Sequence, residues 1–409
     1  MRTAGIICEY NPFHRGHLLQ IEKTREMIGT DGAIVCLMSG FYVQRGEPAL
    51  FPPAVRAEAA VRSGADLVLE LPITAAVNAA GYFAEKAVWC LDQTGCIDVL
   101  SFGSECGEVE PLDALAEALE RPQFQQELKI SLESGCSFAA ARTRALIAMG
   151  LDGELLELPN NALGVEYLRA IRQVGGTMVP FTFQRDRNIP SAGELRSLLT
   201  AKRISNDCGI HYNSKRIDAE QLNIAVPDAM RSIPVSALYK KEMMHTMECG
   251  EKAMRAVLRS LPDAAFERMA FESEGIYSKV RKACRRECSV ENIIMACKSR
   301  RFAYSRLRRT LMCLFLGLTE QDMQRELPYL RVLAFNDRGR QVLSMARKKS
   351  RIPMVAGAVP RDEQSQAYFQ LEQRAADLYT LFGVPGLEER FHMLKSARPI
   401  YVEADQGAG

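Results

Sequence analysis

The chain has 409 residues, of which 47% are apolar and 25% charged, and its formal net charge is +2; this balance is typical of a globular protein long enough for two domains. No apolar run approaches the roughly 20 residues of a membrane-spanning helix, and the N-terminus shows no cleavable signal segment, so we expect a cytoplasmic protein without a membrane partner. The twelve cysteines form no CxxC pair, which argues against structural zinc and for reduced thiols.

The first predicted element is a strand that runs directly into a helix. The stretch Gly5–Leu19 opens with a buried apolar run, breaks at Asn11-Pro12 and restarts as an amphipathic helix. His14 and His17 lie in the break, with Gly16 between them. The first N–H groups of a helix lack partners within the helix and attract anions, so the pattern favours a phosphate site in which both histidines donate hydrogen bonds. The alternative is a capped turn whose histidines are satisfied by the backbone.

A second buried strand is predicted at Ala33–Met38, and it runs into the polar loop Ser39–Pro48. Loops that leave the carboxyl ends of parallel strands hold ligand contacts in α/β folds. We therefore predict that Gln44, Arg45 and Glu47 contact substrate, with a solvated surface turn as the alternative.

Two further strands follow with their helices. A helix is predicted at Pro53–Ser63, a third strand at Asp66–Leu71, an Ala-rich helix at about Ala75–Thr94 and a fourth strand at Ile97–Phe102. Gly103 comes directly after that strand. A glycine there lets a ligand ring approach the backbone closely, although a plain turn explains it equally well.

Helices at 112–120, 123–132 and 137–149 lead to two more polar clusters. Asn160 is predicted as the N-cap of a helix that continues through Ile171, while Asn160 and Asn161 together could instead hold a ribose or a base.

A fifth strand is predicted at Thr177–Phe183, followed by Arg185 and Asp186. Ser191 and Glu194 then form a capping box at the next helix, which leaves Arg196 either solvated or reaching a ligand at the edge of the sheet.

Strands that alternate with helices predict a Rossmann-like parallel sheet of the α/β class over residues 1–205, with ligand groups at the carboxyl ends of the strands. Residues 206–240 show no clear period and are predicted to connect this nucleotide-binding domain to a second one. Residues 241–409 are mainly helical in pattern and end in a small α/β element, with strands at Leu330–Phe335 and Ile352–Val355.

The second domain carries a concentrated basic segment. Arg281–Arg309 contains ten Lys or Arg against two acidic residues, a local charge of +8. Cations interleaved with aromatic rings can bind phosphates and stack on unpaired bases, so a polyanion such as RNA is the predicted partner, with a solvated helix face as the alternative. The predicted RNA-binding residues are Lys298, Arg300, Arg301, Tyr304, Arg306, Arg308 and Arg309.

With these residues laid out, the chain resembles the bacterial tRNA(Met) cytidine acetate ligase family over nearly its whole length. The blocks that carry the resemblance are EYNPFHRGH at Glu9–His17, SGFYVQRGEPA at Ser39–Ala49, FGSE at Phe102–Glu105, PNNALG at Pro159–Gly164 and KSRRFAYSRLRR at Lys298–Arg309. The His14-Arg15-Gly16-His17 block is also similar to the HxGH motif of the wider nucleotidyltransferase superfamily.

The resemblance implies an enzyme that activates acetate with ATP as acetyl-adenylate and transfers the acetyl group to N4 of the wobble cytidine of elongator tRNA(Met). It implies His14 and His17 as catalytic residues, ATP as substrate and Mg²⁺ bound with the ATP, without a dedicated metal site or a stable protein partner. The implied ATP-binding residues are Ile7, Cys8, Glu9, Tyr10, Asn11, Pro12, Phe13, His14, Arg15, Gly16, His17, Leu18, Leu19, Gln20, Gly103, Asn160, Asn161, Arg185 and Asp186. Arg196 is predicted to join them as a second clamp on the phosphates.

Two other functions fit the same motifs. A small-molecule adenylyltransferase would use the same nucleotide site and would not need the basic segment or RNA. A non-catalytic RNA-binding protein would keep the fold alone, because one fold hosts many chemistries; the presence of both histidines argues against it.

Overall fold

The fold is taken from a computed structural model, which describes residues 1–186, 188–200, 202–204, 210–212, 243–271, 275–384 and 393–403. The predicted connecting segment, 206–240, lies outside these residues except for the short strand β9 (Ile210–Tyr212), which pairs with β8 (Lys202–Ile204).

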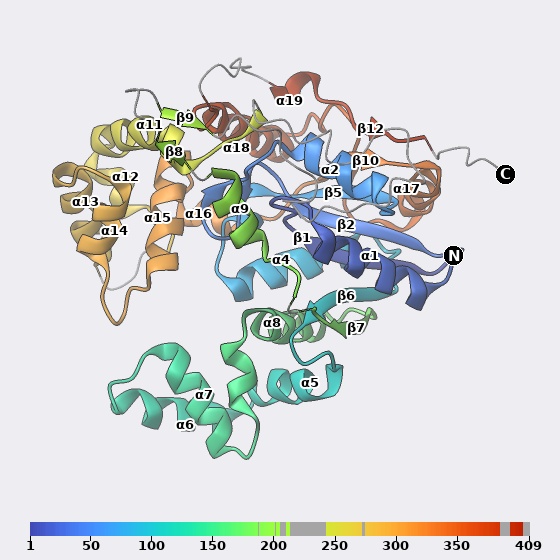
Figure 1. Cartoon of the computed structure of the whole chain (residues 1–409), viewed down its shortest axis with the longest axis horizontal. Helices are drawn as coiled ribbons and strands as arrows, with labels where there is room; N and C mark the ends of the chain where they lie inside the picture. The colour runs from blue at the N-terminus through green and yellow to red at the C-terminus, as the bar shows by residue number, and fades with distance from the viewer. Residues whose placement is uncertain are drawn as a thin grey trace.

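The centre of the molecule is one sheet of eight strands (Figure 1), with the order β11-β10-β5-β2-β1-β6-β7 and β12 beside β10. The strands β1, β2, β5, β6 and β7 are parallel to one another, as the alternating pattern predicted, and β10 is antiparallel to β5. The strand bounds are β1 Thr3–Cys8, β2 Ala33–Ser39, β5 Leu67–Leu71, β6 Val99–Ser104, β7 Val179–Gln184, β10 Leu330–Phe335, β11 Met354–Val355 and β12 Ile400–Tyr401.

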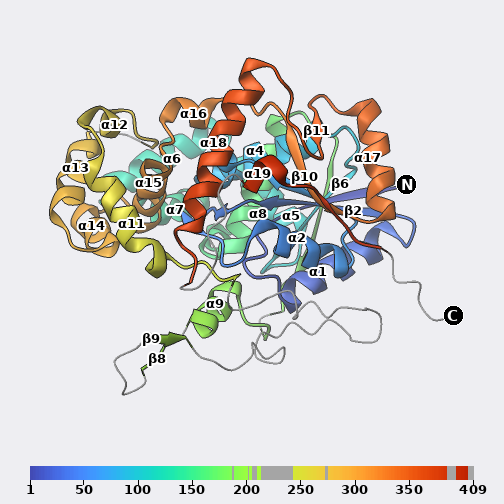
Figure 2. The same cartoon turned by 90° about the horizontal axis from the view of Figure 1, so that it is seen from above.

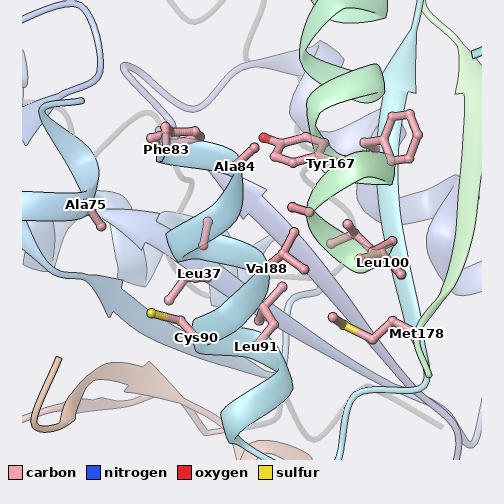
Figure 3. Close-up of a cluster of buried hydrophobic side chains, with 14 of the residues drawn as sticks. Leu37, Ala75, Phe83, Ala84, Val88, Cys90, Leu91, Leu100, Tyr167 and Met178 are labelled. Atoms are coloured by element: carbon pink, nitrogen blue, oxygen red, sulfur yellow. The ribbon is translucent and has the colours of Figure 1, made fainter. Parts of the chain in front are cut away.

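Helices cover both faces of this sheet, which explains why the sequence of β2 is almost continuously apolar. Leu37 faces a core formed with α4 (Ala80–Gln93) and α8 (Pro159–Gln173), part of which is drawn in Figure 3. Its neighbour Cys36 faces the opposite core, which α1 (Arg15–Ile28) and α2 (Pro53–Arg62) complete. Since successive side chains of a strand point to opposite faces, a strand between two helical layers needs apolar residues at every position.

One predicted helix is wrong. The stretch Ala75–Thr94 forms two helices, α3 (Ile73–Ala76) and α4, which are separated at Val77-Asn78-Ala79. The Asn78 side chain accepts a hydrogen bond from the Ala79 N–H and donates one to the Thr74 carbonyl. Asparagine competes with the helix for these backbone groups. The helix is therefore interrupted at Asn78, and α4 begins as a separate helix at Ala80.

The helices α5 (Val109–Ala118), α6 (Pro122–Glu133) and α7 (Phe138–Ala148) occupy the predicted stretches between β6 and α8. In Figure 1, α6 and α7 form a hairpin that extends away from the sheet. The short helix α9 (Ala192–Thr200) follows β7 and begins at the predicted capping box, in which Ser191 and Glu194 bond to each other's backbone N–H.

The C-terminal helices pack around a second apolar core, which α18 (Glu363–Thr380) shares with Phe41 and Tyr42 of the N-terminal part. Figure 2 shows α18 between this helical cluster and the sheet. The other bounds are α11 Met247–Ser260, α12 Asp263–Glu267, α13 Ile276–Arg286, α14 Val290–Cys297, α15 Tyr304–Leu316, α16 Glu320–Gln324, α17 Asp337–Lys349 and α19 Met393–Ser396. The first of these helices was predicted from Lys241, but in the described residues it begins at Met247, because Thr246 caps it.

The strand β10 brings the C-terminal part into the central sheet. Its Arg331 is buried and forms ion pairs with Glu70 of β5 at 3.2 Å and with Glu372 of α18 at 3.1 Å. The expected small α/β element is therefore part of the main sheet, while the proposed division at 205 and 240 stays a prediction. No helix in the described part of the chain is long and apolar enough to cross a membrane.

Candidate functional site

A cavity of about 330 Å³ opens at the carboxyl ends of β1, β6 and β7. This is the edge at which parallel α/β sheets bind ligands. Fourteen of the twenty predicted ATP-binding residues line it: Ile7, Cys8, Glu9, Tyr10, Asn11, His14, Gly16, His17, Leu19, Gln20, Gly103, Asn160, Arg185 and Asp186.

His14 and His17 form a capping box at the start of α1. The Nδ1 of His14 accepts the Gly16 N–H at 3.0 Å, and the Nδ1 of His17 accepts the His14 N–H at 3.2 Å. Their ring centroids are 3.8 Å apart. A Cβ on Gly16 would lie 2.9 Å from Cε1 of His14, so glycine lets the His14 ring fold back over the turn.

The two histidines are held in their neutral form. Burial lowers the pKa of His14 to about 4, with a further contribution from the positive charges of Arg185 and Arg196. Burial and the neighbouring His14 and Arg185 lower the pKa of His17 well below its usual value. Because each Nδ1 accepts a backbone N–H, the ring proton is on Nε2, and each imidazole keeps one N–H donor for a ligand. The capped turn that was the alternative prediction is therefore present. The same two rings also keep the N–H donors that the predicted phosphate site needs.

Arg196 does not line the cavity but supports its wall. Its Nη1 donates to the carbonyl of Asn11 at 2.7 Å, and burial lowers its pKa. The Oδ1 of Asn11 accepts the Leu50 N–H at 2.7 Å. The Nδ2 of Asn11 is buried without a hydrogen-bond partner among the described residues.

Asn160 is not the N-cap that was predicted, because α8 already begins at Pro159. A proline at the first helical position needs no N–H partner, and so it moves the start of the helix ahead of Asn160. Glu105 caps this end by accepting the N–H groups of Asn160 and Asn161 at 3.2 and 2.8 Å.

The two amides then face different ways. Asn160 lines the cavity and accepts a hydrogen bond from Arg185 at 2.6 Å, which fixes the guanidinium at the cavity wall. Asn161 is fully buried and accepts the N–H groups of Glu105 and Cys106, which fixes the loop after β6. A Cβ on Gly103 would lie 3.1 Å from Cγ of Arg185, so this glycine admits the arginine rather than an open ligand space.

The loop after β2 also reaches the cavity. Gln44 and Arg45 line it, and the Gln44 N–H donates to Glu9 at 2.8 Å. Burial raises the pKa of Glu9, while the Gln44 N–H and the charges of Arg196, Arg45 and Arg56 oppose that effect.

Arg56 is a supporting residue that the sequence reasoning missed. It is fully buried, and its guanidinium donates to the carbonyls of Phe51, Glu9, Ser39 and Gly40. It therefore ties the loop after β1 to the loop after β2. The sequence gives no signal for this role, because an arginine in an amphipathic helix is usually exposed.

Glu47 lies outside the cavity and ties the loop to α15. It forms an ion pair with Arg308 at 2.5 Å, and Arg308 also donates to the carbonyl of Arg45 at 2.8 Å. Gly46 has a φ of 73°, and a Cβ there would lie 2.9 Å from Cα of Arg309. The loop backbone is thus packed directly against the helix.

Five other predicted ATP-binding residues do not line the cavity: Pro12, Phe13, Arg15, Leu18 and Asn161. Phe13 and Leu18 belong to the core behind α1, and Arg15 is exposed. The apolar residues that line the other half of the cavity were not predicted, because in the sequence they cannot be told from residues of the hydrophobic core. They are Ala80, Phe83, Phe102, Pro159, Ala162, Leu163, Tyr167, Phe183, Ile189 and Ala192.

The predicted RNA-binding residues divide into an exposed group on a loop and a group on α15 that contacts other parts of the protein. Lys298, Arg300 and Arg301 are exposed on the loop between α14 and α15. Tyr304 donates to Glu291, and Arg306 donates to the carbonyl of Phe271. Arg309 is half-buried, and burial lowers its pKa.

The described residues contain no group of three or more His, Cys, Asp or Glu side chains that could hold a metal ion. The carboxylates among the cavity-lining residues are Glu9 and Asp186. Mg²⁺ in nucleotide sites is held mainly by substrate phosphates and water, with one or two carboxylates, so the cavity suits a cation that arrives with a nucleotide rather than a resident one.

Known proteins match most of the chain. The model of the HIGH Nucleotidyl Transferase family matches residues 1–390. The tRNA(Met) cytidine acetate ligase of Acetivibrio thermocellus is 32% identical over 406 residues, and that of Kosmotoga olearia 35% over 416; each match covers 93% of this chain and 95% of the relative. The crystal structure of Thermotoga maritima TmcAL bound with alpha-thio ATP aligns with a TM-score of 0.84 at 28% identity, over 98% of this chain and 100% of that one.

Proposed function

This chain belongs to the HIGH nucleotidyl transferase family, among the tRNA(Met) cytidine acetate ligases, and we propose that ATP and acetate react in the cavity at the start of α1. The product is acetyl-adenylate, from which the acetyl group passes to N4 of the wobble cytidine of elongator tRNA(Met). The observation that carries this proposal is the pair of neutral histidines at the helix N-terminus, each with its Nδ1 occupied and its Nε2–H left to donate.

The two halves of the cavity suit the two ends of ATP. The phosphates lie at the N-terminus of α1, where the Nε2–H groups and the Arg185 guanidinium provide donors. The adenine lies in the apolar half beside Phe102, Leu163 and Tyr167. Apolar walls with a few fixed polar groups are typical of cofactor and nucleotide pockets.

In the first step an acetate oxygen attacks the α-phosphorus, and the bond to the bridging oxygen breaks as pyrophosphate leaves. His14 and His17 stabilise the charge that develops on the phosphates, and they do so as neutral donors because burial and the nearby arginines keep them unprotonated. Bound with the nucleotide, Mg²⁺ neutralises phosphate charge. Arg185 and Arg45 add fixed positive charge at the cavity wall.

In the second step the cytosine amine attacks the acetyl carbon, AMP leaves and one proton is released. The base must be unpaired to reach the cavity, which an anticodon loop allows more easily than a duplex. Lys298, Arg300 and Arg301 form the exposed cationic surface that binds the tRNA backbone in this proposal.

The test is to incubate the protein with elongator tRNA(Met), ATP and labelled acetate and to analyse the nucleosides. We expect labelled N4-acetylcytidine that depends on ATP; its absence would contradict the proposal. A small-molecule adenylyltransferase would instead bind no tRNA, so a gel shift that weakens steeply with salt separates the two functions.

A further inference from the structure

The first turn of α4 forms part of the cavity rim. Ala80 and Phe83 line the cavity, and between them Tyr82 is 58% exposed. Figure 3 shows Phe83 and Tyr167 at this end of α4, with the rest of the helix running away from them along the core. The exposed ring of Tyr82 thus belongs to the same helical turn as a buried ring of the cavity wall.

Tyr82 differs from the other exposed apolar side chains. Among the described residues, Leu158 is the other exposed large apolar residue that is next in sequence to a cavity-lining residue. Its side chain is aliphatic and less exposed, at 37%. Tyr82 thus combines an aromatic ring, high exposure and a position next to the cavity-lining Phe83 in the sequence. Exposed aromatic side chains at the mouth of a ligand site are the usual means by which proteins hold an unpaired base.

The rim at Tyr82 lies next to an ion-pair network of α7 and α8. A Cβ on the adjacent Gly81 would lie 3.5 Å from Oε2 of Glu166 in α8. The other oxygen of Glu166 accepts a hydrogen bond from Arg142 of α7 at 3.0 Å, and Arg169 also pairs with this carboxylate. The first turn of α4 therefore lies against α8, beside this ion-pair network.

We propose that Tyr82 stacks on the unpaired target cytosine and holds it at the cavity mouth for acetyl transfer. The inference rests on the proposed function and assigns one residue to its second step. A flat, sequence-tolerant contact at the rim complements the phosphate contacts of the 298–303 loop, because those fix the tRNA backbone and leave the base unpositioned. Tyr82 lines no part of the nucleotide cavity itself, so acetate activation proceeds without it.

The experiment compares Tyr82→Ala, Tyr82→Leu and Tyr82→Phe in steady-state acetylation of elongator tRNA(Met). Loss of a base-stacking contact is expected to lower kcat/KM for tRNA by about 5- to 150-fold in the Ala variant. The Phe variant keeps the ring and should stay near wild type, while the Leu variant keeps apolar bulk without the ring and should resemble Ala. Tyr401→Ala, at an exposed aromatic of the distant strand β12, is the matched control and should leave acetylation unchanged.

A second readout reports stacking directly. Pyrrolocytidine placed at the wobble position of the tRNA should lose fluorescence on binding to wild type and to Tyr82→Phe, but not to Tyr82→Leu. Equal quenching in all three proteins, or a Phe variant as slow as Leu, would overturn the proposal. Failure of the proposed function would appear differently, since the wild type itself would then form no acetylcytidine.

Discussion

At the scale of single residues, the site depends on imidazoles that are donors without being cations. His14 is 2% exposed, and its ring is fixed by the Gly16 N–H on one side and the ring of His17 on the other. Protonation of Nδ1 would break the bond to Gly16 and place a positive charge in a buried site beside two arginines. The capping bond thus keeps the Nε2–H tautomer of His14 in place.

His14→Asn tests this arrangement. Asparagine is also a good N-cap, so the variant should keep α1 and its stability near neutral pH. It lacks the Nε2–H donor, and acetate-dependent pyrophosphate exchange should fall by about 10²- to 10³-fold, as for loss of an oxyanion donor. A variant that retains wild-type exchange would show that His14 acts only as a cap.

The same variant has a predicted effect on stability against pH. The folded pKa of His14 is about 4, below the usual 6.5, so the unfolded chain binds this proton first as the pH falls. The contribution of His14 is therefore fully present above about pH 6.5 and is lost as the pH drops toward 4, at most roughly 3 kcal/mol. Urea unfolding midpoints should fall less steeply over this range in His14→Asn than in wild type; identical slopes would contradict the shift.

The residues of the polar half could be predicted from the sequence because HxGH between a strand and a helix is a local pattern. Other contributions depend on the folded chain and leave no local mark. Arg56 lies in an ordinary helix, and its importance comes from carbonyls of two loops that meet only in the fold. Tyr10 adopts a positive φ of 47° in the turn after β1, a conformation that nothing in its residue type indicates.

At the scale of elements, the loop after β2 and the helix α15 act as one unit. Arg308 bonds to the carbonyl of Arg45 and pairs with Glu47, while Gly46 packs on the helix backbone. The sequence placed Arg308 among RNA-binding residues because it belongs to a dense basic run. The structure gives Arg308 partners in the loop after β2, and its RNA-binding role stays a prediction. Charge patterning alone cannot show such a contact.

Arg308→Ala and Arg300→Ala should therefore behave differently. The first frees the loop that carries Arg45 and should raise the KM for ATP in exchange measured without tRNA. The second removes an exposed cation and should raise the KM for tRNA, with a shallower salt dependence, while exchange is unchanged. If Arg308→Ala altered only the tRNA step, the loop contact would have no role in nucleotide binding.

At the scale of the whole molecule, the nucleotide-binding sheet is completed by the C-terminal part of the chain. Alternation of strands and helices predicted the five parallel strands, whose connections are local in sequence. It could not place β10 beside β5, because that pairing is antiparallel and joins residues more than 250 positions apart. Burial raises the pKa of Glu70 to about 7 even with Arg331 beside it, so removal of the arginine would leave a buried carboxyl without its cation.

A fragment of residues 1–205 should therefore fail to fold on its own. It would expose the edge of β5 and leave Glu70 without Arg331, and both changes favour aggregation or unfolding. Size-exclusion chromatography and circular dichroism of the fragment beside the full chain provide the test. A monomeric, folded fragment that binds ATP would show that the sheet does not need β10.

In the proposed function, this cavity activates acetate on ATP before any tRNA takes part. The most direct measurement is the exchange of labelled pyrophosphate into ATP by the full chain, without tRNA and with or without acetate. We predict labelled ATP only when acetate is present, with loss of exchange in His14→Asn. Exchange that is absent with acetate, or equally fast without it, would contradict the account.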